Sequence, residues 1–198
     1  APTADTEAPK GVDVTRVTEW FQAHAAPVVP PLTFDLIAGG RSNLTYRVTD
    51  AAGRAWVLRR PPLGQVLATA HDMGREHRII SALAPTDVPV APVVGMCTGA
   101  DGNGPPFYVM EFVDGLVARD AEVARTLGVE ARAHAGRQAA EVLARIHAVD
   151  PDAVGLGDLG RKGGYVERQL KRWYGQWQES RTRLLPGVDE EYAALAAG

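Results

Sequence analysis

Residues 39–46 read Gly-Gly-Arg-Ser-Asn-Leu-Thr-Tyr and connect two segments that have the composition of β-strands. Residues 32–38 precede this stretch, and residues 44–49 alternate apolar and polar side chains as a half-buried strand does. Glycines allow the backbone to approach a phosphate closely, and successive N–H groups in a tight turn form an anion-binding concavity. Because Gly-Gly turns are also common in hairpins that bind nothing, this stretch alone predicts a hairpin and leaves an anion site open.

The next strand and the helix after it carry a candidate pair of opposite charges. A turn over residues 50–53 leads into a strand over residues 55–59, which ends in Arg59. Thr69 and Asp72 have the spacing of a capping box and predict a helix through Leu83 that carries Glu76. A strand cation held by a helix carboxylate positions phosphates in nucleotide kinases. Taken alone, however, two such residues are more often separate charges on the surface.

A third candidate feature is Phe-Tyr-Val-Met-Glu-Phe-Val-Asp-Gly at residues 107–115. Residues 89–97 and 107–113 both predict strands, and the second one runs directly into a glycine. Such a segment can offer backbone N–H and C=O groups to a flat ring while apolar side chains cover it. A buried strand followed by a simple turn explains the same residues equally well.

The character of the sequence changes near Asp114. Before it, one amphipathic helix over residues 12–25 precedes the strands; after it, residues 130–148 and 165–185 have helical periodicity. We therefore predict an α+β fold: an antiparallel sheet with one internal helix, followed by the start of a helical lobe. The predicted organisation is a loose tail over 1–11, a strand-rich lobe over 12–113 and an incomplete helical lobe over 114–198.

The order of these features is that of protein-kinase-like folds, and the chain resembles the aminoglycoside-phosphotransferase and choline-kinase-like superfamily. The resemblance runs from about residue 32 to residue 185. Within the superfamily, the chain is most similar to the branch of kinase-like domains associated with acyl-CoA dehydrogenases. The segments that carry it are Gly-Gly-Arg-Ser-Asn-Leu-Thr-Tyr (39–46), Val-Leu-Arg-Arg-Pro-Pro (57–62), Phe-Tyr-Val-Met-Glu (107–111), Leu-Ala-Arg-Ile-His-Ala-Val-Asp (143–150) and Glu-Arg-Gln-Leu-Lys-Arg-Trp (167–173).

The resemblance implies a small-molecule kinase that uses ATP and Mg²⁺ to phosphorylate a hydroxyl group. It assigns Arg59, in place of the usual lysine, to the nucleotide phosphates, with Glu76 as its partner on the helix. It implies that residues 110–113, which we call the hinge segment, contact adenine. The implied nucleotide-binding residues are Gly39, Gly40, Ser42, Asn43, Arg59, Glu76, Met110, Glu111, Phe112 and Val113.

The catalytic part of such a site is absent from this sequence. The superfamily pattern is His-Gly-Asp followed five residues later by Asn, whereas the only asparagines here are Asn43 and Asn103. We therefore predict no catalytic residue and no metal ligand in this chain, which we interpret as an inactive N-terminal portion of a longer kinase. A non-catalytic nucleotide-binding module and a protein-interaction module remain alternatives, and the phosphate acceptor (a hydroxyacyl-CoA, an aminoglycoside or another molecule) stays open.

Composition excludes several other classes of protein. The 198 residues carry a net charge of −3, which argues against nucleic-acid binding. No apolar run approaches the roughly 20 residues that span a membrane. The single cysteine, Cys97, fits a reducing cytoplasm. We also expect the chain to self-associate, because an incomplete helical lobe would leave apolar faces uncovered.

Overall fold

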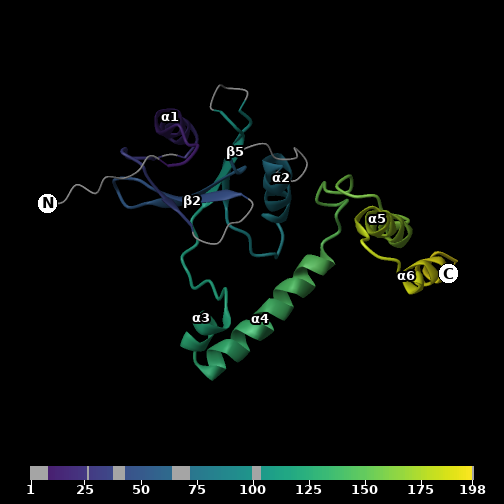
Figure 1. Ribbon diagram of the computed structural model, residues 1–198. Helices are drawn as coiled ribbons and strands as arrows, with labels where there is room; N and C mark the ends of the chain where they lie inside the picture. The colour runs from purple at the N-terminus through teal and green to yellow at the C-terminus, as the bar shows by residue number, and fades with distance from the viewer. Residues whose placement is uncertain (1–8, 26, 38–42, 64–71, 100–103, 198) are drawn as a thin grey trace. The chain divides into compact units, whose positions relative to one another are not determined.

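The computed structural model describes residues 9–25, 27–37, 43–63, 72–99 and 104–197. Five strands form one antiparallel sheet in the order β1-β2-β3-β5-β4 (Figure 1). The strands are β1 (Thr33–Leu36), β2 (Leu44–Thr49), β3 (Ala55–Arg60), β4 (Val93–Cys97) and β5 (Phe107–Glu111). The helices are α1 (Val14–His24), α2 (Met73–Leu83), α3 (Ala121–Thr126), α4 (Val129–Ala148), α5 (Tyr165–Ser180) and α6 (Pro186–Ala197).

All five predicted strands are present, and the differences lie at their ends and among the helices. The fourth strand begins at Val93 and not at residue 89, because Pro89 and Pro92 have no N–H group to donate to a ladder. Helix α5 ends at Ser180, five residues before the predicted end, and α6 begins at Pro186, since proline fits the first turn of a helix. Helix α3 was not predicted.

The β2–β3 hairpin is fixed by Asp50 at its turn. The Asp50 carboxylate accepts hydrogen bonds from the backbone N–H groups of Ala52, Arg54 and Val29, at 3.0, 2.9 and 3.1 Å. Burial pushes the pKa of Asp50 up, but these three N–H groups and the Arg54 charge outweigh it and hold the pKa below its usual value. The turn sets the register that pairs Thr45 with Arg59.

Helix α1 covers one face of the sheet. Its residues Val17, Trp20 and Phe21 are buried, as the predicted apolar face requires, whereas Val14 is 37% exposed. The Phe21 ring packs edge-on against Trp56, with centroids 5.5 Å apart, and the core continues through buried side chains of β2, β3 and β5. This face therefore supplies most of the apolar burial of the sheet and leaves the opposite face for other roles.

Helix α2 lies against β4 and β5, on the side of the sheet away from α1 (Figure 1). Asp72 caps it by accepting the Arg75 N–H at 3.0 Å; Thr69, the predicted cap, lies outside the described residues. Met73 is buried in the first turn, and Ile79, Ile80 and Leu83 are half-buried. The helix thereby holds Glu76 over the sheet.

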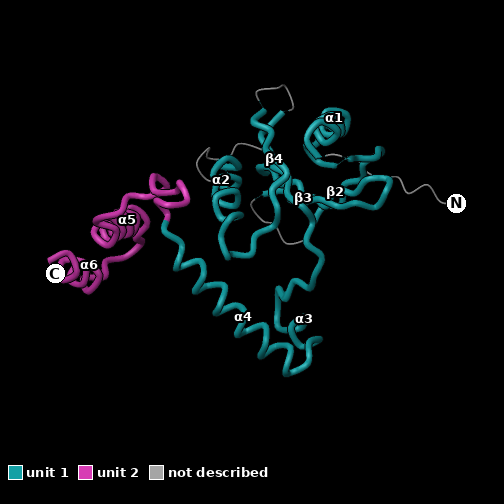
Figure 2. The backbone as a smooth tube through the Cα atoms, turned by 180° about the vertical axis from the view of Figure 1, so that it is seen from behind, with its two compact units in different colours: residues 1–150 teal, residues 151–198 magenta. Residues whose placement is uncertain are grey.

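The chain divides into two compact units, residues 1–150 and 151–198 (Figure 2). The first contains the sheet and α1 to α4, and the second contains α5 and α6. This division is a different one from the lobe boundary predicted between residues 113 and 114, which stays a prediction. Among the residues that the structure describes, none of the helices combines the length and the apolar character needed to cross a membrane.

Candidate functional site

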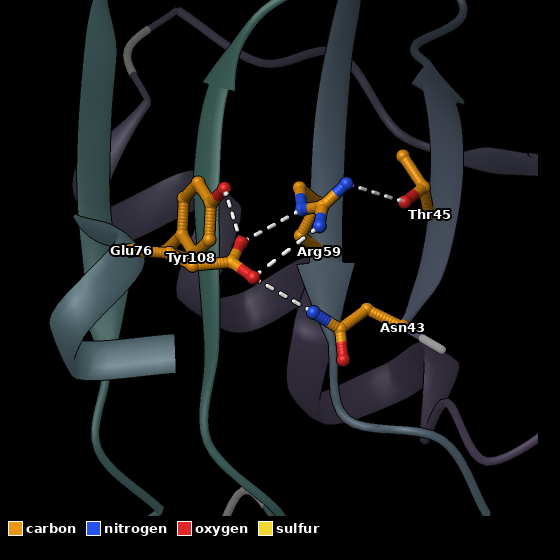
Figure 3. Close-up of polar contacts among 5 residues, drawn as sticks. All are labelled: Asn43, Thr45, Arg59, Glu76 and Tyr108. Atoms are coloured by element: carbon orange, nitrogen blue, oxygen red, sulfur yellow. Dashed lines mark hydrogen bonds and ion pairs between the residues drawn. The ribbon is translucent and has the colours of Figure 1, made fainter. Parts of the chain in front are cut away.

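A bidentate ion pair joins the end of β3 to α2. Arg59 Nε donates to Glu76 Oε2 at 3.0 Å, and the Arg59 Nη2 group donates to Glu76 Oε1 at 3.4 Å (Figure 3). The two side chains are 29% and 33% exposed, so the pair is half-buried and open to solvent on one side. The pairing predicted from the resemblance is therefore present.

Two further side chains hold the same carboxylate. Asn43, immediately before β2, donates its amide to Glu76 Oε1 at 2.8 Å, and the Tyr108 hydroxyl donates to Oε2 at 3.0 Å. Arg59 also donates from Nη1 to Thr45 Oγ1 at 3.2 Å. Figure 3 shows these residues converging from β2, β3, β5 and α2. Glu76 thus accepts four hydrogen bonds, which fixes both it and the Arg59 guanidinium in place.

Burial shifts the pKa values of two side chains beside the ion pair, Tyr108 and His77. Burial raises the pKa of Tyr108 well above its usual value; Arg59 opposes this shift, and the Glu76 carboxylate, which accepts a hydrogen bond from the Tyr108 hydroxyl, reinforces it. The His77 ring lies edge-on to Tyr108 with centroids 6.2 Å apart, and burial lowers the pKa of His77. At neutral pH, Tyr108 therefore remains a hydrogen-bond donor to Glu76 and His77 is neutral.

Sheet register places a second row of side chains on the same face. Thr45, Arg59 and Tyr108 are cross-strand partners, and two residues further along the strands Arg47, Val57 and Met110 are partners in the same way. Side chains two apart in a strand point to the same face, about 6.6 Å apart at 3.3 Å per residue. The ion pair and the second row are therefore immediate neighbours.

An apolar pocket of about 450 Å³ opens over this second row, and we call it the sheet pocket. Its volume lies within the range of small-molecule sites. The Arg47 guanidinium lies over the Phe112 ring at 4.6 Å from its centroid, and both side chains line the pocket. The lining residues are Asp35, Leu36, Ile37, Thr45, Arg47, Val57, Ala91, Met110, Glu111, Phe112, Val113, Gly115 and Val117.

Comparison with known proteins identifies the family. The model of the phosphotransferase enzyme family matches residues 33–198. The chain belongs to the phosphotransferase enzyme family. Its α+β fold is that of the kinase-like phosphotransferases, as the sequence predicted. Relatives named as acyl-CoA dehydrogenase family members confirm the predicted resemblance to the branch associated with those enzymes.

Two curated relatives and one solved structure illustrate these likenesses. Acyl-CoA dehydrogenase family member 10 of Mus musculus is 36% identical over 168 residues, which are 84% of this chain and 15% of that protein. Acyl-CoA dehydrogenase family member 11 of the same species is 35% identical over 159 residues, 80% and 20% of the two chains. The crystal structure of a candidate aminoglycoside phosphotransferase from Ralstonia eutropha has a TM-score of 0.75 and 32% identity, and the match covers 94% of this chain and 53% of that one. This phosphotransferase-family chain thus spans a fifth or less of the curated relatives.

The nucleotide-binding residues implied by the resemblance fall into two groups in the structure, apart from Gly39, Gly40 and Ser42, which lie outside the described residues. One group is Asn43, Arg59 and Glu76, in which Asn43 and Arg59 each donate hydrogen bonds to Glu76. The other is the hinge segment, Met110, Glu111, Phe112 and Val113, all of which line the sheet pocket. Their role in nucleotide binding stays a prediction.

The sequence reasoning missed several residues of this face. Tyr108 holds Glu76, and Arg47 and Val57 line the pocket beside the hinge segment. Alternation from Arg59 along β3, together with the strand pairing, was the signal that could have found them. Arg60 points to the other face, where it is 5% exposed and donates from Nε to the Pro61 carbonyl at 3.2 Å.

The donor set for a divalent metal ion is incomplete in the part of the chain that the structure describes. Those residues contain no group of three His, Cys, Asp or Glu side chains that could hold a metal ion. Glu76, the carboxylate paired with Arg59, is already engaged by Arg59, Asn43 and Tyr108. The described residues therefore do not fit Mg²⁺.

Proposed function

We propose that this chain forms the nucleotide-binding part of an ATP-dependent phosphotransferase that acts on a hydroxyl group of a small molecule. The observation that supports the proposal is the juxtaposition of the sheet pocket with the Arg59–Glu76 pair on one face of the sheet. A nucleoside triphosphate has an apolar, flat end and an anionic end. The second row offers an apolar pocket for the flat end, and the adjacent row offers the Arg59 cation for the anionic end.

Each row has a distinct role in the proposal. The base stacks on Val57 in the sheet pocket and hydrogen-bonds to backbone groups of the hinge segment, whose first two residues, Met110 and Glu111, are the last two of β5. Arg59 contacts phosphate oxygens, because its planar guanidinium presents several N–H donors in a fixed fork. Glu76 does not contact the nucleotide; it orients Arg59, with Asn43 and Tyr108 fixing the carboxylate.

The acceptor is a separate part of the proposal. Two relatives are named as acyl-CoA dehydrogenase family members, and the solved structure is that of a candidate aminoglycoside phosphotransferase. A hydroxyl-bearing acyl-CoA is therefore the acceptor that we would test first, and an aminoglycoside the second. A cytoplasmic location belongs to the same proposal and rests on the single cysteine.

We further propose that this chain by itself binds nucleotide without transferring phosphate. Phosphoryl transfer requires an aspartate to receive the hydroxyl proton and an asparagine and aspartate to hold metal. The sequence has no asparagine after Asn103, and the described residues offer no metal-binding cluster. A non-catalytic nucleotide-binding module is accordingly the second candidate function, and the two candidates differ in whether ATP is turned over.

Calorimetric titration with adenosine, AMP, ADP and ATP tests the binding proposal. We expect affinity to rise along the series as phosphates reach Arg59, and the rise to be lost in Arg59→Ala. Arg16→Ala is the control, because Arg16 is an exposed arginine of α1. Equal affinity across the series, or equal behaviour of both variants, would refute the role of Arg59; no binding of any compound at millimolar concentration would refute the function.

A further inference from the structure

Asp35 and Arg47 are cross-strand neighbours of opposite charge that do not pair with each other. They are direct partners in the β1–β2 ladder, where opposite side chains have Cβ atoms roughly 5 Å apart and charge pairs normally form. Among the described residues, neither side chain has a hydrogen bond or an ion pair, yet both line the sheet pocket. The arrangement leaves a carboxylate unused at the edge of an apolar pocket.

The Phe112 ring accounts for the position of Arg47. The guanidinium carbon lies 4.6 Å from the ring centroid, a cation–π contact that holds the side chain against Phe112 of the hinge segment. The Asp35 carboxylate, an acceptor-only group, is thereby left without a partner among the described residues at the lining of the pocket. A ligand that uses it must present hydrogen-bond donors there.

The sugar of a nucleotide presents such donors. If the base stacks on Val57 and the phosphates meet Arg59, the sugar lies between these two rows, and Asp35, across β2 from Val57 in the base row, borders the same pocket. A ribose has two adjacent hydroxyl groups, and one carboxylate can accept from both. We propose that Asp35 is the residue that recognises the ribose hydroxyl groups, so that the site selects ribonucleotides; this inference rests on the proposed function.

The experiment compares ATP with 2′,3′-dideoxy-ATP by calorimetry in the unsubstituted chain, Asp35→Ala and Asp35→Asn. A charge-assisted hydrogen bond contributes about 1.5–3 kcal/mol, so we expect the unsubstituted chain to favour ATP by about 10-fold to 100-fold. In Asp35→Ala the two nucleotides should bind within about twofold of each other, through a loss of ATP affinity alone. Thr33→Ala, an exposed residue of the same strand, is the control and should keep the preference.

The sign of the change on ATP is decisive. If Asp35 were only a negative charge near the triphosphate, removing it would strengthen ATP binding, because like charges repel. A tighter ATP complex in Asp35→Ala, or a preference for ATP that survives the substitution, would therefore overturn the inference. Absence of any nucleotide binding in the unsubstituted chain would overturn the proposed function together with it, whereas binding that depends on Arg59 but ignores Asp35 would overturn this inference alone.

Discussion

The Tyr108 hydroxyl donates to Glu76 Oε2, the same oxygen that accepts the Arg59 Nε–H. The carboxylate is therefore held from β5 as well as from β3, and its position follows from the β3–β5 register that pairs Tyr108 with Arg59. Because the sheet aligns both donors, α2 needs only to place Glu76 above them. The guanidinium is positioned before any ligand arrives, which is the condition for strong binding of an anion.

Tyr108→Phe tests this support directly. The substitution removes one hydrogen-bond donor and leaves the Arg59 and Asn43 bonds to Glu76. We therefore expect the free energy of unfolding to fall by about 1 kcal/mol. Thermal melting measures this loss of stability. Ultraviolet titration of the unsubstituted chain separately checks the burial of Tyr108. Since burial raises the pKa of Tyr108, the unsubstituted chain should retain at least one tyrosine that stays protonated above the pH at which an ordinary tyrosine ionises. A full complement of tyrosines titrating near pH 10 would contradict the burial.

Arg59→Lys distinguishes a fork from a point charge. Lysine keeps the charge but cannot bind two oxygens of Glu76 or of a phosphate in one plane. We expect Arg59→Ala to weaken ATP binding by about 10-fold to 100-fold and Arg59→Lys to weaken it by about 3-fold to 10-fold. Calorimetry at one fixed salt concentration measures both. Wild-type affinity in Arg59→Lys would mean that only the charge matters.

The contact of α1 with the sheet should dominate the stability of residues 9–111. Phe21 is fully buried against Trp56, and truncation of a buried phenylalanine costs about 3–5 kcal/mol. We expect Phe21→Ala to lower the urea midpoint sharply. Val14→Ala on the exposed side of the same helix should change stability by less than about 0.5 kcal/mol. Similar effects of the two substitutions would show that α1 does not pack as described.

His77 makes stability depend on pH in a defined direction. Burial lowers the pKa of His77 in the folded state, so the folded chain binds this proton less readily than the unfolded chain, whose histidine titrates near about 6.5. Its effect on stability is therefore neutral above that pH and becomes unfavourable as the pH falls below it. Urea unfolding at pH 7.5 and pH 5.5 should show a smaller loss on acidification in His77→Gln than in the unsubstituted chain. An equal loss in both would contradict the shift.

The exposed apolar surface of the second compact unit, residues 151–198, leads us to expect self-association. Its α5 exposes Trp173 by 62% and Tyr165 by 66%, and an apolar groove of about 490 Å³ lies between α5 and α6. We propose that a second copy of the chain covers this surface. Light scattering should show mass increasing with concentration, and Trp173→Ser should reduce the increase while Gln176→Ser, on the same helix, should not. A monomer at all concentrations would contradict the proposal.

The sequence was sufficient to predict the sheet and the Arg59–Glu76 pair because each depends on local pattern or on a family order. Strand alternation located β2 without error at both ends, and Asp50 with Gly53 marked the turn. Helix ends were predicted less well: the helical pattern was extended to residue 185, whereas α5 ends at Ser180, and a new helix begins at Pro186.

The surroundings of the pair could not be read from the sequence in the same way. Tyr108 and Arg47 reach the site through the register of strands far apart in the chain, and the sequence does not state which strands are neighbours. The β3–β5 pairing skips β4, so Tyr108 lies beside Arg59 although 49 residues separate them. Asp35 becomes a candidate binding residue only because Arg47, its cross-strand partner, contacts Phe112 and does not pair with it.

The most direct test of the central claim is a nuclear magnetic resonance titration of the ¹⁵N-labelled chain with ATP. The account predicts that the Arg59 Nε–H signal and the backbone amides of Met110–Val113 shift together with one dissociation constant, while the Arg16 Nε–H does not move. Shifts confined to the α5–α6 unit, or an unchanged hinge segment at saturating ATP, would show that the face carrying Arg59 and Glu76 does not bind nucleotide.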